Sequence, residues 1–569
     1  LPINLLCMFR RIQYYQYCTR IYNFSDFMGK FLFIVSAVSV CALQLPTNQG
    51  KAITAISYVV SIPIVACIAV FFLKKYDIFQ NLKNYPKNVK CFAGIYAVLT
   101  AFVFCVHLTC IISEKFPASL PRYLKLCAYL YPSILAVFSL FALFAMWAAF
   151  LNFALPRIGN FIRSLTKWEK SFIILSYAFF LPLLIADANC LDFSENCVLF
   201  NTDNIQKLYA NIFSPSNELA GNAFAYIGHC QNTEKEFFQP IAMLPFSIPM
   251  TFVSYLIKIS SGYYIFPILC KIFLGVGFVS VSAVLFSRFL PLGNAERFLF
   301  CLIYLFSFSS ILYIFIPEQY TLIVFCIAVL LTAVMNRNPH LSEIFWVSVG
   351  TLITNGILIF FVDRWKPLSE RLYSLFIGAV FVVCISLVLG QAHSFVKIAG
   401  CIRSDSISYS KPMCEESIFL FFESVGGGIA SSGNFKTEKK IETNTGTEKF
   451  FVDTAFLERL NVGGVCVAFF ALLGIVYAWR LLISKICLLW IGLAVFILVV
   501  CGYGAVEAAP LLYSYYFMWA FLIPVVILAN GILPRYFALP LMGAVALSIM
   551  FYNLSAFYGF YTEAAVLLG

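Results

Sequence analysis

Two acidic residues lie in short polar sequences beside long apolar runs. Asp203 stands in the NTDN sequence at 201–204, and Glu318 stands in the FIPEQY sequence at 315–320. A carboxylate at the edge of a membrane could act as a general base on an acceptor hydroxyl or bind a divalent cation. The simpler interpretations are a helix cap for Asp203 and a solvated turn for Glu318. These two acids are our candidate catalytic and metal-binding residues.

Further polar residues near the apolar runs are candidates for substrate binding. Asp187 and Asp192 closely follow the end of an apolar run and compete with Asp203 for the catalytic role. Lys271 lies inside another apolar run, where it either snorkels to the headgroups or binds a lipid phosphate. Two histidines near loop edges and two bases suited to phosphate recognition complete the set: His229, His393, Lys397 and Arg403. Structural histidines and a solvated basic face are the simpler explanations for these four.

The composition places these residues in a membrane protein. Hydrophobic residues make up 62% of the 569 and charged residues only 11%, with a mean hydropathy of +0.89. A soluble chain carries about 25% charged residues. Many apolar runs reach about 18 residues, enough to cross a bilayer as a helix, so we expect an all-α, polytopic transmembrane bundle of about 13–15 membrane segments. The net charge of +11 is concentrated in short loops, which indicates topology and no nucleic-acid partner.

Strongly basic loops alternate with less basic ones in the first part of the chain. Residues 10–30, 74–90 and 157–170 are rich in Lys and Arg, and such loops stay in the cytoplasm. The N-terminus is therefore predicted to be cytoplasmic. An acidic first loop (188–238) and a second long loop (393–462) are predicted on the outer side, and the chain is expected in a bacterial inner membrane.

Two apolar segments, 240–257 and 341–362, are ambiguous. Either 240–257 spans the membrane, or its prolines make it a broken interfacial helix. We prefer the interfacial reading because it leaves Arg288 inside and Glu318 outside, as the positive-inside rule requires. It needs another segment that does not cross, and 341–362, interrupted by TNG at 354–356, is the candidate.

The chain is predicted to have four parts. A four-helix transmembrane module (1–165) precedes a core (166–392) that contains the first outer loop. The second outer loop (393–462) precedes a C-terminal four-helix segment (463–569). Within the second outer loop, the Gly-, Ser- and Thr-rich stretch 424–449 is predicted to be flexible.

The layout of about 170–392 resembles the GT-C superfamily of polytopic glycosyltransferases, which includes protein mannosyltransferases and the aminoarabinose transferase of lipid A. The resemblance rests on a long outer loop with an early Asp203, the QPIAMLP sequence at 239–245 and the PEQY turn at 317–320. It implies a GT-C-like fold, with interfacial helices in the first long outer loop.

The resemblance also implies roles for single residues. Asp203 would be the catalytic base and Glu318 the assisting acid. Gln239 stands where the family usually has His or Lys before proline, and it is a candidate substrate contact. The donor would be a polyprenyl-phosphate-linked sugar, and a divalent cation (Mg²⁺ or Mn²⁺) is the candidate cofactor.

Other function classes also fit a polytopic membrane protein. A transporter or flippase of lipid-linked glycans would show ionisable residues at mid-membrane depth and paired repeats, and the sequence favours neither. A polymerase or ligase of such glycans would rely on outer arginines, of which 393–462 has Arg403 and Arg459. We therefore expect a glycosyltransferase that moves a sugar from a polyprenyl-phosphate carrier to an extracytoplasmic lipid, glycan or protein.

Overall fold

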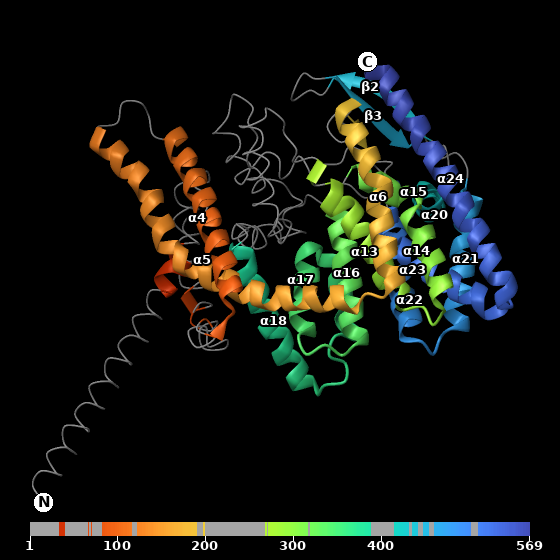
Figure 1. Cartoon of the computed structure of the whole chain (residues 1–569), viewed down its shortest axis with the longest axis horizontal. Helices are drawn as coiled ribbons and strands as arrows, with labels where there is room; N and C mark the ends of the chain where they lie inside the picture. The colour runs from red at the N-terminus through yellow and green to blue at the C-terminus, as the bar shows by residue number, and fades with distance from the viewer. Residues whose placement is uncertain are drawn as a thin grey trace, which may run out of the picture. The chain divides into compact units, whose positions relative to one another are not determined.

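Figure 1 shows the fold of the chain as a computed structural model. The structure describes residues 33–39, 66–67, 70, 82, 84–115, 122–190, 197–199, 268–269, 271–316, 319–388, 415–431, 435–441, 448–454, 460–501 and 510–568. The chain divides into two compact units. The first unit comprises 1–163, 212–249 and 373–402, and the second comprises 164–211, 250–372 and 403–569. The predicted four-part division stays a prediction.

The first unit contains two long helices, α4 (Lys87–Lys115) and α5 (Arg122–Ser164, in this unit to Arg163). Trp147 of α5 donates from Nε1 to Thr100 Oγ1 of α4 at 3.1 Å. The Trp147 ring also packs against Tyr96, with centroids 4.7 Å apart. A buried indole with its N–H satisfied holds the two helices together at this level.

The second unit is a helical bundle. Four of its helices are α6 (Lys167–Cys190), α13 (Phe278–Ser287), α16 (Gln319–Met335) and α23 (Pro510–Ile532). The other α-helices are α14 (Asn294–Leu305), α15 (Phe308–Phe315), α17 (Leu341–Thr351), α18 (Leu368–Val388, in this unit to Leu372), α20 (Glu415–Ile429), α21 (Val462–Tyr477), α22 (Leu482–Val495) and α24 (Arg535–Leu568). Two π-helices, η1 (Lys271–Gly277) and η3 (Phe496–Val500), and one 3₁₀-helix, η2 (Ile353–Phe361), complete the helical elements described for this unit.

The apolar helices make this a multi-pass membrane protein. Among the described residues, five helices are long and apolar enough to span a bilayer: Leu130–Ser164, Lys167–Asn189, Leu482–Val500, Tyr513–Ile532 and Arg535–Val566. Helices α14 and α15, bent by 60° at a short break, would make a sixth span together. A lipid bilayer is therefore the environment of the chain, as predicted.

A small sheet interrupts the helical architecture, so the all-α prediction holds for the bundle and misses three strands. Their order is β1 (Cys197–Leu199), β3 (Glu448–Thr454) and β2 (Phe435–Ile441). β1 pairs with β3 in parallel, with Val198 opposite Phe451, and β2 pairs with β3 antiparallel. Because β1 belongs to the first predicted outer loop and the other strands to the second, the two loops meet in one sheet.

The predicted flexible stretch at 424–449 is wrong for its described residues. Helix α20 continues to Ile429, β2 occupies Phe435–Ile441, and β3 begins at Glu448. The glycine-rich part of this stretch forms the end of α20 and packs within the bundle, because glycines allow helix backbones to approach closely.

The segment 341–362 enters the bundle and returns, as the preferred topology requires. α17 and η2 have 11 and 9 residues, which rise by about 16 Å and about 18 Å. Ser342 Oγ, at the start of the segment, donates to Asp363 Oδ2, just after its end, at 3.2 Å. The predicted interruption at 354–356 lies in η2, where Asn355 Oδ1 accepts a hydrogen bond from Tyr516 OH at 2.8 Å.

Candidate functional site

Helix α6 runs antiparallel to the continuous helix formed by η1 and α13, and an ion pair lies near each end of this helix pair. Lys271 Nζ lies 2.6 Å from Asp187 Oδ2, and Arg288 Nε lies 2.7 Å from Glu169 Oε1. The 18 helical steps from Glu169 to Asp187 rise by about 27 Å, close to the hydrocarbon thickness of about 30 Å. We name the two ends of the second unit after these contacts, the Asp187 end and the Arg288 end.

The pair at the Asp187 end is buried on both sides. The side chains of Lys271 and Asp187 are 0% and 1% exposed. The prediction that Lys271 snorkels to the headgroups is therefore wrong, because Asp187 binds its ammonium group inside the bundle. Lys271 also begins the π-helix η1, a rare conformation that occurs frequently at functional sites.

Glycines let η1 pack closely against its neighbours. A Cβ on Gly275 would lie 2.7 Å from the carbonyl oxygen of Ile314 in α15, and a Cβ on Gly277 would lie 2.7 Å from Tyr177 OH in α6. Gly275 faces backbone atoms that cannot give way, so glycine is required there, whereas a Cβ at Gly277 would have to displace the tip of the Tyr177 side chain. The helix that carries Lys271 is thus fixed against α6 on one side and α15 on another.

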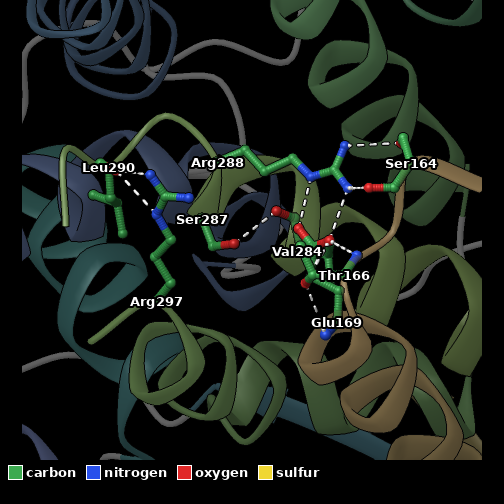
Figure 2. Close-up of polar contacts among 8 residues, drawn as sticks. All are labelled: Ser164, Thr166, Glu169, Val284, Ser287, Arg288, Leu290 and Arg297. Carbon is green, nitrogen blue, oxygen red and sulfur yellow. Dashed lines mark hydrogen bonds and ion pairs between the residues drawn. The ribbon is translucent and has the colours of Figure 1, made fainter. Parts of the chain in front are cut away.

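Figure 2 shows the network at the Arg288 end. Arg288 donates from Nε and Nη2 to the two carboxylate oxygens of Glu169, at 2.7 and 2.8 Å, which is a bidentate pair. Thr166 N donates to Glu169 Oε2 at 2.7 Å, while Glu169 N donates to Thr166 Oγ1 at 3.4 Å. These reciprocal bonds form a capping box at the start of α6. Arg288 also donates to the carbonyl oxygen of Ser164 at 3.3 Å, which ties it to the chain before the helix.

The loop after Arg288 brings α14 and α24 to the same end. Arg297 donates from Nη2 to the carbonyl oxygen of Leu290 at 2.8 Å (Figure 2). Arg535, the first residue of α24, donates from Nε to Glu296 Oε1 at 2.6 Å. The arginines at 288, 297 and 535 therefore share one end of the unit.

Strands from both predicted outer loops lie together in the second unit. The sheet joins the two outer loops through β1, which follows α6 in the chain. Helix α15 ends at Phe315 beside η1, and α16 begins at Gln319, so the facing ends of these two helices belong to the Asp187 end as well.

The structure brings two of the predicted site residues together, namely Asp187 and Lys271. The other predicted site residues lie outside the described residues: Asp192, Asp203, His229, Gln239, Glu318, His393, Lys397 and Arg403. The same holds for the segment 240–257. Within the described ranges, no group of three or more His, Cys, Asp or Glu side chains could hold a metal ion, and the two acids predicted to hold one lie beyond them.

Sequence reasoning missed the partners that fix these residues. Glu169 carries a usable signal, since the TKWE sequence at 166–169 matches the pattern of a capping box. Its partner Arg288 has no local signal, because 119 residues separate the two. The sequence interpretation also passed over Glu423, although it is an isolated acid in the apolar sequence IFLFFESVGGG at 418–428.

Comparison with known proteins identifies no relative. A scan against protein-family models, a search of curated proteins and a search of solved structures each give no match.

Proposed function

We propose that the protein is a GT-C-type membrane glycosyltransferase, which moves a sugar from a polyprenyl-phosphate carrier to an extracytoplasmic lipid, glycan or protein acceptor. The observation that carries this proposal is the buried Asp187–Lys271 pair at the end of the bundle where both long loops meet. Ionisable residues inside membrane helices are costly to bury and therefore favour a functional role. A lipid-linked donor presents its phosphate–sugar bond at the membrane surface, and the proposal puts the Asp187 end at that surface.

In this proposal, Asp203 acts as the base on the acceptor hydroxyl and Glu318 assists from the neighbouring outer turn. The two carboxylates would also be the ligands of a Mg²⁺ or Mn²⁺ ion, whose positive charge would favour departure of the donor phosphate. Lys271 would stabilise the arrangement through Asp187 at the base of the first loop. The Asp187 end then faces the outside of a bacterial inner membrane, and the N-terminus lies in the cytoplasm.

Substitution of the two acids tests this proposal. Asp203→Asn and Glu318→Gln should each reduce sugar transfer by a factor of about 100 or more, the scale of general acid–base catalysis. Glu370→Gln, at an exposed acid near the start of α18, is the matched control and should keep full activity. Transfer is measured with radiolabelled polyprenyl-phosphate sugars and the full-length protein in lipid vesicles. Full activity in both site variants would refute the assignment of these acids.

A transporter of lipid-linked glycans is the second candidate, because specific backbone features favour it. The bent pair α14–α15, the π-helices and the re-entrant α17–η2 segment resemble the broken helices of secondary transporters. A vesicle assay distinguishes the two functions by following both the sugar and its carrier. Movement of intact donor across the bilayer, without cleavage of its sugar–phosphate bond, would favour the transporter, and lengthening of a lipid-linked glycan would favour a polymerase or ligase.

A further inference from the structure

Glu423 differs from the other buried acids of the protein. Five carboxylate side chains are buried among the described residues, and four of them form ion pairs with Lys or Arg: Asp187 with Lys271, Glu169 with Arg288, Glu296 with Arg535, and Asp363 with Lys366. Glu423 is 2% exposed, and its contact is a hydrogen bond from a neutral amide, Asn461 Nδ2, at 2.8 Å. A buried carboxylate normally requires a nearby cation, so this residue needs an explanation.

The elements around α20 offer no basic side chain to Glu423. Helix α20 packs against α15, α21, α23 and η3. None of these four sequences contains Lys, Arg, His, Asp or Glu, and their ionisable side chains are tyrosines and a cysteine. α20 itself contains three glutamates and no base. Over this part of the described chain, a protein side chain does not supply the missing positive charge.

The amide of Asn461 is oriented as a donor toward Glu423. Asn461 is the N-cap of α21, and its Oδ1 accepts a hydrogen bond from Gly464 N at 2.9 Å. Asn461 Oδ1 thus bonds to the start of α21, and Asn461 Nδ2 faces the carboxyl group of Glu423. The partial positive charge at a helix N-terminus is about half an elementary charge, less than the full charge that each of the other four buried acids receives.

Close helix packing keeps water away from this contact. A Cβ on Gly426 would lie 2.6 Å from both Asn461 Oδ1 and Gly464 N, and a Cβ on Gly464 would lie 1.9 Å from the carbonyl oxygen of Phe422. The backbones of α20 and α21 therefore touch directly beside Glu423. Solvation by water is restricted at this place, which adds to the cost of a carboxylate charge.

We propose that Glu423 is a proton-binding site, whose carboxyl group holds an exchangeable proton between α20 and α21. A proton requires one oxygen atom, whereas a metal ion requires several oxygen ligands, and the neighbouring Asn461 oxygen already accepts from Gly464. Release of the proton leaves a charge that no basic side chain of α15, α20, α21, α23 or η3 compensates. Proton exchange at Glu423 and the seating of α20 are therefore coupled. This inference does not depend on the proposed glycosyl transfer.

Labelling with dicyclohexylcarbodiimide tests the proposal, because this apolar reagent reacts with protonated carboxyl groups inside membrane proteins. The carboxyl proton moves to one carbodiimide nitrogen and the carboxyl oxygen bonds to the central carbon. Migration of the acyl group to nitrogen then gives a stable acylurea without loss of atoms. Mass spectrometry of the full-length protein, labelled in its membrane, should find the adduct on Glu423. The ion-paired Glu169 and Glu296 are internal controls that should stay unlabelled, and Glu423→Gln should abolish the adduct.

Infrared spectroscopy tests the protonation of Glu423 if dicyclohexylcarbodiimide cannot reach this residue. The wild-type protein should show the carbonyl band of a neutral carboxylic acid, and Glu423→Gln should remove it. The same variant should melt within about 2 °C of the wild type, since it replaces one neutral group by another. Glu169→Gln, which breaks the bidentate pair with the largely buried Arg288, is the contrasting variant and should lower the melting temperature. Absence of the neutral-acid band in the wild type would overturn the proposal, as would equal destabilisation by the two variants.

Discussion

At the scale of single residues, ion pairing separates acids that support the bundle from acids that are candidates for chemistry. Asp187 is held at 2.6 Å by a fully buried lysine, so in the proposed function it positions the base of the first loop and does not contact the substrate. Among the acids of the first loop, this favours Asp192 and Asp203 as the residues that can face a substrate. The order of preference among the three acids was open on sequence alone.

Breaking the buried pair should destabilise the protein strongly. Lys271→Met breaks the buried ion pair by removing one partner, which is expected to cost about 3–5 kcal/mol. The double variant Asp187→Asn/Lys271→Met removes both charges and should recover most of that loss. Thermal unfolding of the detergent-solubilised protein measures the three variants. A Lys271→Met protein as stable as the wild type would contradict the pairing.

The bidentate contact at the Arg288 end should depend on the shape of the guanidinium group. Arg288→Lys keeps the charge but cannot bond both oxygens of Glu169 in the same way, so we expect a loss of about 1–2 kcal/mol. Arg297→Lys is the control, because Arg297 donates to a single carbonyl oxygen. The melting temperature should fall for the first variant and change little for the second. An equal response would mean that the bidentate geometry is unimportant.

At the scale of elements, glycine contacts decide how α20 enters the bundle. A Cβ on Gly464 in α21 would lie 1.9 Å from Phe422 O in α20, whereas a Cβ on Gly492 in α22 would meet no atom within 4 Å. The two helices must therefore separate in Gly464→Ala but not in Gly492→Ala.

We expect Gly464→Ala to lose about 1–3 kcal/mol through overpacking, and Gly492→Ala to gain up to about 1 kcal/mol through helix propensity. Chemical denaturation in detergent measures both variants. A stable Gly464→Ala protein would show that α20 and α21 are not in direct backbone contact.

The sequence predicts elements well where one physical rule dominates. Apolar length predicts the membrane helices, and charge placement together with the TNG sequence predicts that 341–362 turns back. The sequence does not reveal the sheet, because β1 has three residues and its pairing with β3 joins segments about 250 residues apart in the chain. The sequence also does not predict helix α20, because its apolar residues lie within a longer polar stretch.

The site shows the same division between local and distant information. Asp187 and Lys271 are recognisable as unusual because each is ionisable in or beside an apolar run. Their contact joins residues 84 positions apart and depends on the antiparallel register of α6 with η1 and α13. Patterns in one sequence carry no information on that register, so the two residues are predicted only as separate substrate contacts.

At the scale of the whole molecule, the two ends of the second unit should face opposite sides of the membrane. An epitope tag inserted after Pro291, in the loop at the Arg288 end, should lie on the cytoplasmic side. Antibody added outside should therefore bind it only after the membrane has been made permeable. A tag inserted between Ile441 and Glu448, the ends of β2 and β3, should be reached from outside. Access to both tags from the same side would contradict the proposed arrangement.

The central claim is that sugar transfer takes place at the Asp187 end. The most direct measurement uses full-length protein reconstituted in one orientation, with a radiolabelled polyprenyl-phosphate sugar and acceptor supplied to one face of the vesicles at a time. The account predicts that labelled acceptor forms when both substrates are on the face of the Asp187 end, and that Asp203→Asn abolishes its formation. Formation of labelled acceptor with both substrates on the face of the Arg288 end would contradict it. A donor that stays uncleaved on whichever face it is supplied would contradict it as well.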